Sequence, residues 1–156
     1  MKTRVSIAMG AIIALGFNAC TKMQAIQPHI KQITSAMDST LKTQALLLGK
    51  WNVVSDTTYA GVNTGTNPAV YIGQAGDYFD FVADGHIYIK EGAILDTLSF
   101  KLASGRQIDI NSFMPILNNQ SATCQIGGIN AKSLSIASPM LTPPAGPQQR
   151  IVSLSR

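Results

Sequence analysis

The segment Leu48-Gly49-Lys50-Trp51-Asn52-Val53-Val54-Ser55 marks the point at which this chain changes character, and it contains the one tryptophan of the sequence. Before it, apolar residues recur every three or four positions; after it, apolar and polar residues alternate. The first spacing is typical of an amphipathic helix and the second of a half-buried strand. The sequence therefore predicts a helix followed by a β-domain.

The predicted helix covers residues 28–48. Pro28 suits a first helical turn and Gly49 suits a helix end. About twenty residues at 1.5 Å each give a length near 30 Å. Such a helix could hold the β-domain away from a membrane, lie along the membrane, or dimerise. Its apolar stripe consists of Ile26, Ile30, Ile33, Met37 and Leu41.

A tight turn at Ala83-Asp84-Gly85 allows the register of one hairpin to be predicted. A three-residue loop, with its glycine in the left-handed conformation, pairs Phe81 with Ile87 and Phe79 with Ile89. A two-residue loop would instead place an aromatic residue opposite a residue of the other face. The three-residue loop is preferred because it keeps one face apolar.

The same reasoning applies to Ala103-Ser104-Gly105. A three-residue loop there pairs Phe100 with Ile108 and Leu98 with Ile110. The two hairpins together predict four consecutive antiparallel strands with a shared apolar face.

Further strands are predicted at 51–59, 122–127, 132–137 and 149–156, which gives eight in all. Short strands at regular spacing indicate either a sandwich or an up-and-down barrel. If consecutive strands are antiparallel neighbours, the tight turns gather at one end of the domain. The long loops 60–76, 112–121 and 138–148 then gather at the other end. A closed base and an open mouth favour a small all-β, eight-stranded antiparallel barrel.

A strand that begins with Gly49-x-Trp51 resembles the lipocalin family, and more narrowly the lipocalin-like domains of Bacteroidetes-type lipoproteins. The resemblance covers residues 49–156 and implies that this strand starts at the closed base of the barrel. It also implies that a basic side chain near the end of the last strand lies over Trp51. Arg156 is the first candidate and Arg150 the second, while a frayed terminus is the alternative.

Residues 1–19 resemble a lipoprotein signal peptide. Lys2 and Arg4 precede the apolar segment 5–17, which is too short to span a bilayer core of roughly 30 Å. A small residue stands directly before Cys20, as in a bacterial lipobox. The alternatives are a buried structural cysteine and an ordinary secretory cleavage nearby.

The lipobox implies cleavage before Cys20 and attachment of lipid to its thiol, with residues 20–27 as a tether. The protein is then anchored in a membrane of the bacterial cell envelope. Surface-exported lipoproteins of this type are usually acidic just after the cysteine, whereas this chain has Thr21-Lys22-Met23-Gln24. We therefore expect the protein to face the periplasm.

Composition argues against nucleic-acid binding. Only 13% of the residues are charged, and no run of lysine or arginine occurs. Removal of Lys2 and Arg4 with the signal peptide lowers the formal net charge from +4 to +2. Phosphate recognition requires clustered positive charge.

Catalytic and cofactor-binding patterns are also missing from the sequence. The two histidines, His29 and His86, belong to different predicted elements and have no converging partners of ordinary metal-site spacing. The pair 127–128 follows a strand but opens no helix, so it does not predict a phosphate site. We expect neither an enzyme nor a bound metal or cofactor.

The remaining acidic and sulfur side chains have structural explanations. Asp77, Asp80 and Asp84 lack the ligand pattern of a calcium loop and fit a solvated strand face. Cys124 alternates in register with Ile126, which predicts a buried, inert thiol.

Two functions remain open for the predicted barrel. It could bind a small hydrophobic ligand in its mouth, or its long loops could bind an envelope protein while the barrel acts as a scaffold. Apolar loop residues could form a lid, a contact patch or a plug. Asp96 would point inward if residues 92–93 form a two-residue turn. The candidate mouth residues are Tyr71, Ile72, Asp96, Phe113, Met114 and Met140.

Overall fold

The computed structural model describes residues 26–60, 68–117, 119–144 and 146–156. The predicted signal peptide 1–19, Cys20 and the tether up to residue 25 lie outside the described residues. Within the described ranges, one α-helix, α1 (Ile26–Leu47), precedes nine strands. These are β1 (Gly49–Ala60), β2 (Ala69–Ile72), β3 (Tyr78–Phe81), β4 (His86–Glu91), β5 (Ile94–Ser104), β6 (Gln107–Asn111), β7 (Ser121–Ile129), β8 (Ser133–Ala137) and β9 (Gln148–Ser155). A 3₁₀ turn, η1 (Pro115–Leu117), follows β6.

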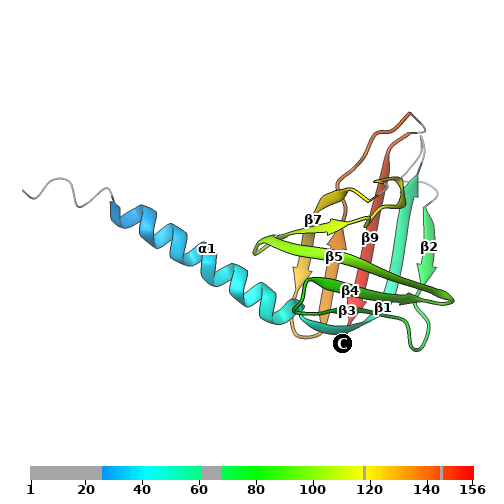
Figure 1. Ribbon diagram of the computed structural model, residues 1–156, viewed down its shortest axis with the longest axis horizontal. Coiled ribbons are helices and arrows are strands. Elements are labelled where there is room, and N and C mark those ends of the chain that lie inside the picture. Colours follow the sequence, from blue (N-terminus) through cyan, green and yellow to red (C-terminus); the bar gives the residue numbers. More distant parts are fainter. Residues whose placement is uncertain (1–25, 61–67, 118, 145) are drawn as a thin grey trace, which may run out of the picture.

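Eight of the strands form a closed antiparallel barrel (Figure 1). From β3 to β9 each strand pairs with the next, and β1 pairs with both β3 and β9. Closure satisfies the backbone groups that an open sheet would leave at its edges. The predicted fold class, an eight-stranded antiparallel barrel preceded by one helix, is confirmed.

The additional strand β2 corrects the prediction that residues 60–76 are a loop. β2 pairs with the second half of β1, and β3 pairs with the first half on the same edge. Gly73 makes the bend between them possible, because a Cβ at this position would lie 2.0 Å from the carbonyl oxygen of Val53. The sequence does not predict β2, because no residue of this strand is buried. Its apolar side chains Val70 and Ile72 lie on an exposed face.

The interior of the barrel is filled by large side chains from the inward faces of the strands. The most deeply buried of them occupy the base and the middle of the bore. They include Trp51, Phe79, Phe81, Ile87, Ile108, Ile110, Leu134, Ile136 and Leu154. Cys124 is also fully buried, as predicted, and burial raises the pKa of its thiol to about 12.

The two predicted hairpin registers have different outcomes. The first is confirmed: Phe81 pairs with Ile87, Phe79 pairs with Ile89, and Gly85 has a φ of +89°. The second is wrong by two residues, because Phe100 pairs with Ile110 rather than with Ile108.

The second hairpin turns later than predicted. A bulge lies between Leu102 and Ser104, and Ser104 still pairs with Gln107. A shift of two residues leaves every side chain on its own face, so an apolar pattern cannot detect it. The turn is also held from outside the hairpin, since the Thr43 hydroxyl of α1 donates a hydrogen bond of 2.9 Å to the Gly105 carbonyl.

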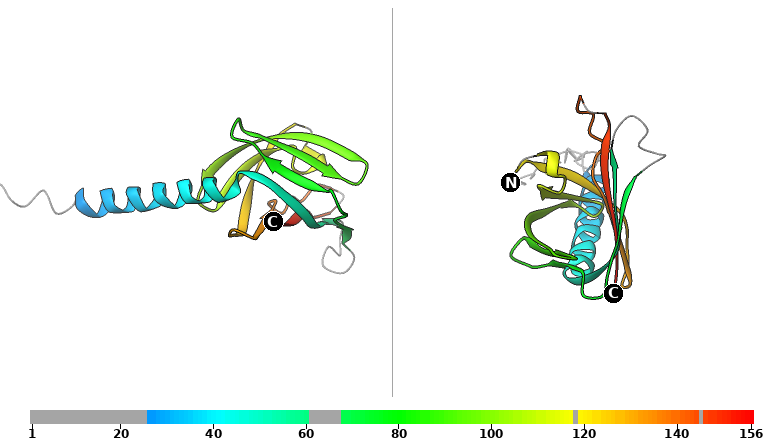
Figure 2. Two further views of the ribbon diagram at one scale, coloured as in Figure 1. Left: turned by 90° about the horizontal axis from the view of Figure 1, so that it is seen from below. Right: turned by 90° about the vertical axis from the view of Figure 1, so that its right-hand side faces the viewer.

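Helix α1 projects away from the barrel and touches it only near its C-terminal end (Figures 1 and 2). Its predicted extent, 28–48, agrees with the observed Ile26–Leu47 to within two residues. Met37 and Leu41 of the predicted stripe are about 60% exposed and do not pack on the barrel. Instead Leu47 is fully buried in the base. No helix among the described residues is long and apolar enough to cross a bilayer.

The base of the barrel is closed by Arg156. Its guanidinium carbon lies 3.8 Å from the centroid of the Trp51 ring. The guanidinium also donates hydrogen bonds to the carbonyl oxygens of Leu46 at 3.2 Å, Leu47 at 3.4 Å and Leu48. These are carbonyl groups that the end of a helix leaves without partners, and a positive charge there opposes the helix dipole. Of the two candidate arginines, Arg156 is therefore the one above Trp51.

Replacing Arg156 should loosen the base. We expect Arg156→Ala to lower the free energy of unfolding by about 1 to 2 kcal/mol, through loss of the cation–π contact and of the bonds to the helix end. Urea denaturation followed by Trp51 fluorescence measures both the stability and the change around the indole. Arg106→Ala, at an exposed position of a neighbouring base turn, is the control. Equal stability and equal emission of the Arg156→Ala and natural proteins would contradict this role.

Candidate ligand-binding site at the barrel mouth

A bulge in β1 places a carboxylate inside the barrel. Val53 pairs with Leu154, but the next pair is Ser55 with Ser153, so Val54 is an extra residue in the ladder. The bulge reverses the faces of the residues that follow it. Asp56 therefore points inward and is 9% exposed.

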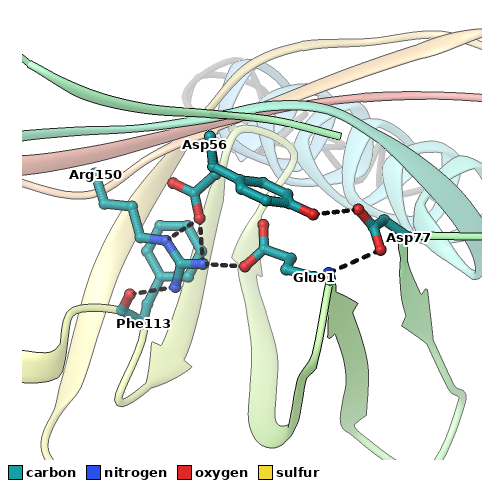
Figure 3. A network of polar contacts seen from close by, with 7 residues as sticks. Asp56, Asp77, Glu91, Phe113 and Arg150 are labelled. Carbon is teal, nitrogen blue, oxygen red and sulfur yellow. Dashed lines mark hydrogen bonds and ion pairs between the residues drawn. The ribbon is translucent and has the colours of Figure 1, made fainter. Parts of the chain in front are cut away.

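Arg150 of β9 meets this carboxylate and a second one from β4 (Figure 3). Its Nε and Nη2 both donate to Oδ2 of Asp56, at 2.8 and 2.5 Å. Nη2 also lies 3.2 Å from Oε2 of Glu91, and Nη1 donates to the Phe113 carbonyl oxygen at 2.9 Å. The side chains of Arg150, Asp56 and Glu91 are only 14, 10 and 11% exposed. We call these three residues the mouth triad.

The mouth triad lies directly on the apolar core. The guanidinium carbon of Arg150 is 4.8 Å from the centroid of the Phe113 ring and 6.0 Å from that of Phe79. Both rings present a π face to a cation, which helps to offset the loss of water around the guanidinium. The triad is thus the boundary between a filled barrel and an open mouth.

Protonated Glu91 hydrogen-bonds to Asp56, but when both carboxyl groups are ionised, two oxygens of the mouth triad have no donor among the described residues. They are Oδ1 of Asp56 and Oε1 of Glu91, and both are buried. Burial raises the pKa of Glu91 to about 7, and the negative charge of Asp56 adds to this effect. At neutral pH the Glu91 carboxyl group therefore gains or loses its proton easily.

A second polar group, Tyr71 with Asp77, supports the rim of the mouth (Figure 3). The Tyr71 hydroxyl donates to Asp77 Oδ2 at 2.5 Å, and the backbone N–H groups of Gln74 and Gly92 donate to the same carboxylate at 2.8 and 2.9 Å. The Tyr71 bond, followed by that of Gln74, lowers the pKa of Asp77; the same Tyr71 bond raises the pKa of the phenol to about 12.

Asp77 therefore corrects a prediction. It does not lie on a solvated strand face, since it is 2% exposed and ties the residues before β3 to the turn after β4. The Lys90 ammonium lies 4.0 Å from its Oδ1. Asp84, by contrast, is exposed at the base turn, where it accepts a hydrogen bond of 3.0 Å from the backbone N–H of His86.

A cavity of about 470 Å³ opens above the mouth triad. Its floor is polar and is formed by the triad. Its walls are mainly apolar, and they are formed by Ala69, Val70, Tyr71, Ile89 and Ile94, with Thr58 and Asp96 at the same cavity. A few fixed polar groups among apolar walls are typical of a small-molecule site.

A larger hollow of about 670 Å³ lies at the base, between α1 and β7. Lys42, Thr43, Arg106 and Ile126 are among its lining residues. It contains none of the buried oxygens that lack a partner. The mouth cavity is the better candidate site for this reason, although it is smaller.

The structure divides the candidate mouth residues into three groups. Tyr71 and Asp96 line the cavity. Asp96 pairs with Ile89 after the two-residue turn 92–93, and so lies on the inward side, although it is exposed. Ile72 and Met140 are 65 and 51% exposed and do not line it.

Phe113 and Met114 form the third group. Both are buried, at 0 and 2% exposure, so they close the barrel as a plug and do not form an exposed lid. This corresponds to the third of the alternatives that the sequence left open for the long loops. Phe113 still contributes to the site, through its carbonyl oxygen and its ring against Arg150.

Sequence reasoning missed Asp56, Glu91 and the role of Arg150. For two of them a signal exists: Glu91 continues the inward alternation of Ile87 and Ile89, and Arg150 precedes Val152 in the same way. A charged residue at an inward position near a strand end indicates a polar layer. Asp56 carries no such signal, because the bulge that turns it inward is not visible in the alternation.

In comparisons with known proteins, no protein-family model, no curated protein and no solved structure matches the chain. Within the described residues, no group of three or more His, Cys, Asp or Glu side chains is arranged to hold a metal ion.

Glu91 is the one glutamate of the sequence, which makes its titration directly observable. A single ¹³C carboxyl signal from selectively labelled glutamate should titrate near pH 7, well above the ordinary value of 4.5. The folded protein holds this proton more tightly than the unfolded chain. The contribution of Glu91 to stability is therefore complete below about pH 4.5 and is lost as the pH rises through 7.

Between pH 5 and pH 8 we expect the free energy of unfolding of the natural protein to fall by about 2 to 3 kcal/mol more than that of Glu91→Gln. One pKa unit corresponds to about 1.4 kcal/mol. Urea denaturation at the two pH values measures this difference. Asp80→Asn, on the outer face of β3, should keep the pH dependence of the natural protein. A glutamate signal that titrates near pH 4.5 would contradict the buried triad.

Proposed function

We propose that this protein is a lipid-anchored, lipocalin-like carrier or sensor of the bacterial cell envelope that binds a small apolar molecule in the barrel mouth. The observation that carries the proposal is the cavity of about 470 Å³ above the mouth triad. Its volume falls within the range of roughly 300 to 1,000 Å³ that is usual for small-molecule sites. No catalytic or cofactor-dependent step is part of the proposal.

The ligand binds above the core and not within the bore. Eight strands enclose a space that either side chains or one small ligand can fill. Here aromatic and branched side chains fill it up to Phe113 and Arg150. A ligand consequently contacts the rim formed by β2, β4 and β5.

The apolar part of the ligand packs against Val70 and Ile94. Both line the cavity, and they are 52 and 65% exposed. Covering such side chains is favourable, at about 25 cal/mol for each Å² of apolar surface removed from water. A ligand here gains the burial that the free protein does not achieve.

This site predicts a pattern in the binding of apolar fluorophores. We expect Val70→Ser and Ile94→Ser each to weaken binding roughly three- to tenfold, because each removes apolar contact area of about one side chain. Met140→Ser is the matched control, since Met140 is equally exposed but lies outside the cavity. Fluorescence titration measures the affinities. An effect of Met140→Ser equal to the others would place the binding elsewhere.

The lipid anchor is proposed from the sequence, because Cys20 lies outside the described residues. The lipobox-like segment and the absence of acidic residues at 21–24 support a periplasm-facing, membrane-anchored protein. Helix α1 supports the same view, since it extends from the base and leaves the mouth at the opposite end of the barrel (Figure 1).

Labelled fatty acid should be incorporated when the full chain is expressed in a bacterium that processes lipoproteins. Cys20→Ser should abolish incorporation because it removes the acylated thiol. The matched control is Cys124→Ala, which changes the other cysteine and should keep the label. The label is measured after denaturing electrophoresis. Persistent label in Cys20→Ser protein would refute the anchor.

A scaffold that binds an envelope protein is the alternative. It is favoured by Met37 and Leu41, which are about 60% exposed on a helix that leaves the barrel. Protein partners commonly cover such apolar surface. A membrane pull-down that loses partners with Met37→Ser and Leu41→Ser, together with no fluorophore binding at the mouth, would favour the scaffold.

A further inference from the structure

We propose that the ligand of the mouth cavity is a cationic amphiphile, with an ammonium or similar hydrogen-bond-donating head on the mouth triad and an apolar body against the rim. This inference rests on the proposed function, since it names the chemical class of molecule for the same cavity. Three observations support it.

The first observation is the charge around the cavity. Three carboxylates line it, those of Asp56, Glu91 and Asp96, against one guanidinium, that of Arg150. The nearby Lys90 is directed to Asp77, at 4.0 Å. Negative charge remains in excess even when Glu91 is protonated. At low dielectric such an excess favours a cation and opposes an anionic head.

The second observation concerns the donors of Arg150. Its Nε, Nη1 and Nη2 are already engaged by Asp56, Phe113 and Glu91. These four bonds leave one of the five N–H donors, on Nη1, and a fatty-acid carboxylate bound there would lie beside two carboxylates. The arginine at the floor is therefore not a receptor for an acidic ligand.

The third observation is the pair of buried oxygens that lack a donor once Glu91 is ionised, Oδ1 of Asp56 and Oε1 of Glu91. The Asp56 side chain is only 10% exposed, and both residues line the cavity. A buried acceptor that lacks a donor costs free energy. A primary ammonium carries three N–H donors, so a head group at this floor supplies the donors that the carboxylates lack.

The apolar walls complete the recognition. Ala69, Val70 and Ile94 lie on the rim side of the cavity, above the carboxylates. A head on the floor therefore directs an alkyl or aryl body towards these side chains. Neither half of the site selects the ligand alone: the charge selects the head, and the rim selects an apolar body.

Three probes of one chain length separate the chemistry of the head from that of the body. Decylamine, decanol and decanoate are titrated at pH 7.5, below their aggregation limits, against a neutral apolar fluorophore bound to the full protein. We expect decylamine to bind at least tenfold more tightly than decanol, and decanoate to bind most weakly. Added salt should weaken decylamine binding more than decanol binding.

Asp96→Asn tests the charge without disturbing the core, because Asp96 is exposed and asparagine keeps the oxygen that accepts from the Thr97 N–H. We expect it to reduce the preference for decylamine over decanol at least threefold. Glu91→Gln, checked for native folding, should do the same. Asp84→Asn at the opposite end of the barrel is the control and should leave the preference unchanged.

Equal binding of decylamine and decanol, or tightest binding of decanoate, would overturn this inference while leaving a ligand-binding mouth intact. A decylamine preference that survives both Asp96→Asn and Glu91→Gln would also overturn it. If neither the probes nor any neutral fluorophore binds, both this inference and the proposed carrier function are refuted.

Discussion

The contact between Arg156 and Trp51 holds the two ends of the barrel domain and the end of the helix at one point. The guanidinium lies over the indole and also donates hydrogen bonds to the carbonyl groups of Leu46, Leu47 and Leu48. The Trp51 N–H donates to the Leu47 carbonyl at 2.8 Å. The first strand, the last strand and α1 therefore meet through one planar cation. Since β1 and β9 close the sheet, barrel closure and helix attachment are linked at this base.

The opposite ends of the same two strands hold a buried ion pair at the mouth. There β1 and β9 bring Asp56 and Arg150 together on top of the apolar core. Burying such a pair is costly, and an apolar replacement is often at least as stable. A site with two unpartnered oxygens is more costly still. The buried polar groups of the mouth are thus less well satisfied than those of the base, and a bound molecule with hydrogen-bond donors would supply the missing contacts.

The parts of this protein that could be predicted are those that depend on local alternation. The turn at Gly85 could be assigned because only one loop length keeps Phe79 and Phe81 on the apolar face. The next hairpin could not, because a two-residue shift keeps Phe100 inward in either register. At the site, Tyr71 and Asp96 were placed at the mouth, whereas Phe113 and Met114 turned out to be buried. Apolar loop residues look alike in sequence whether they form a lid or a plug.

By itself the sequence determined the helix, the alternating strands and the apolar face of most of these strands. These follow from periodicity and from turn residues. Only the tertiary structure decided that β2 pairs with β1, and that Asp56, Glu91 and Arg150 converge. The physical reason is the bulge after Val53: one extra residue reverses the faces of β1, and its position depends on pairing with β9, a strand nearly one hundred residues away.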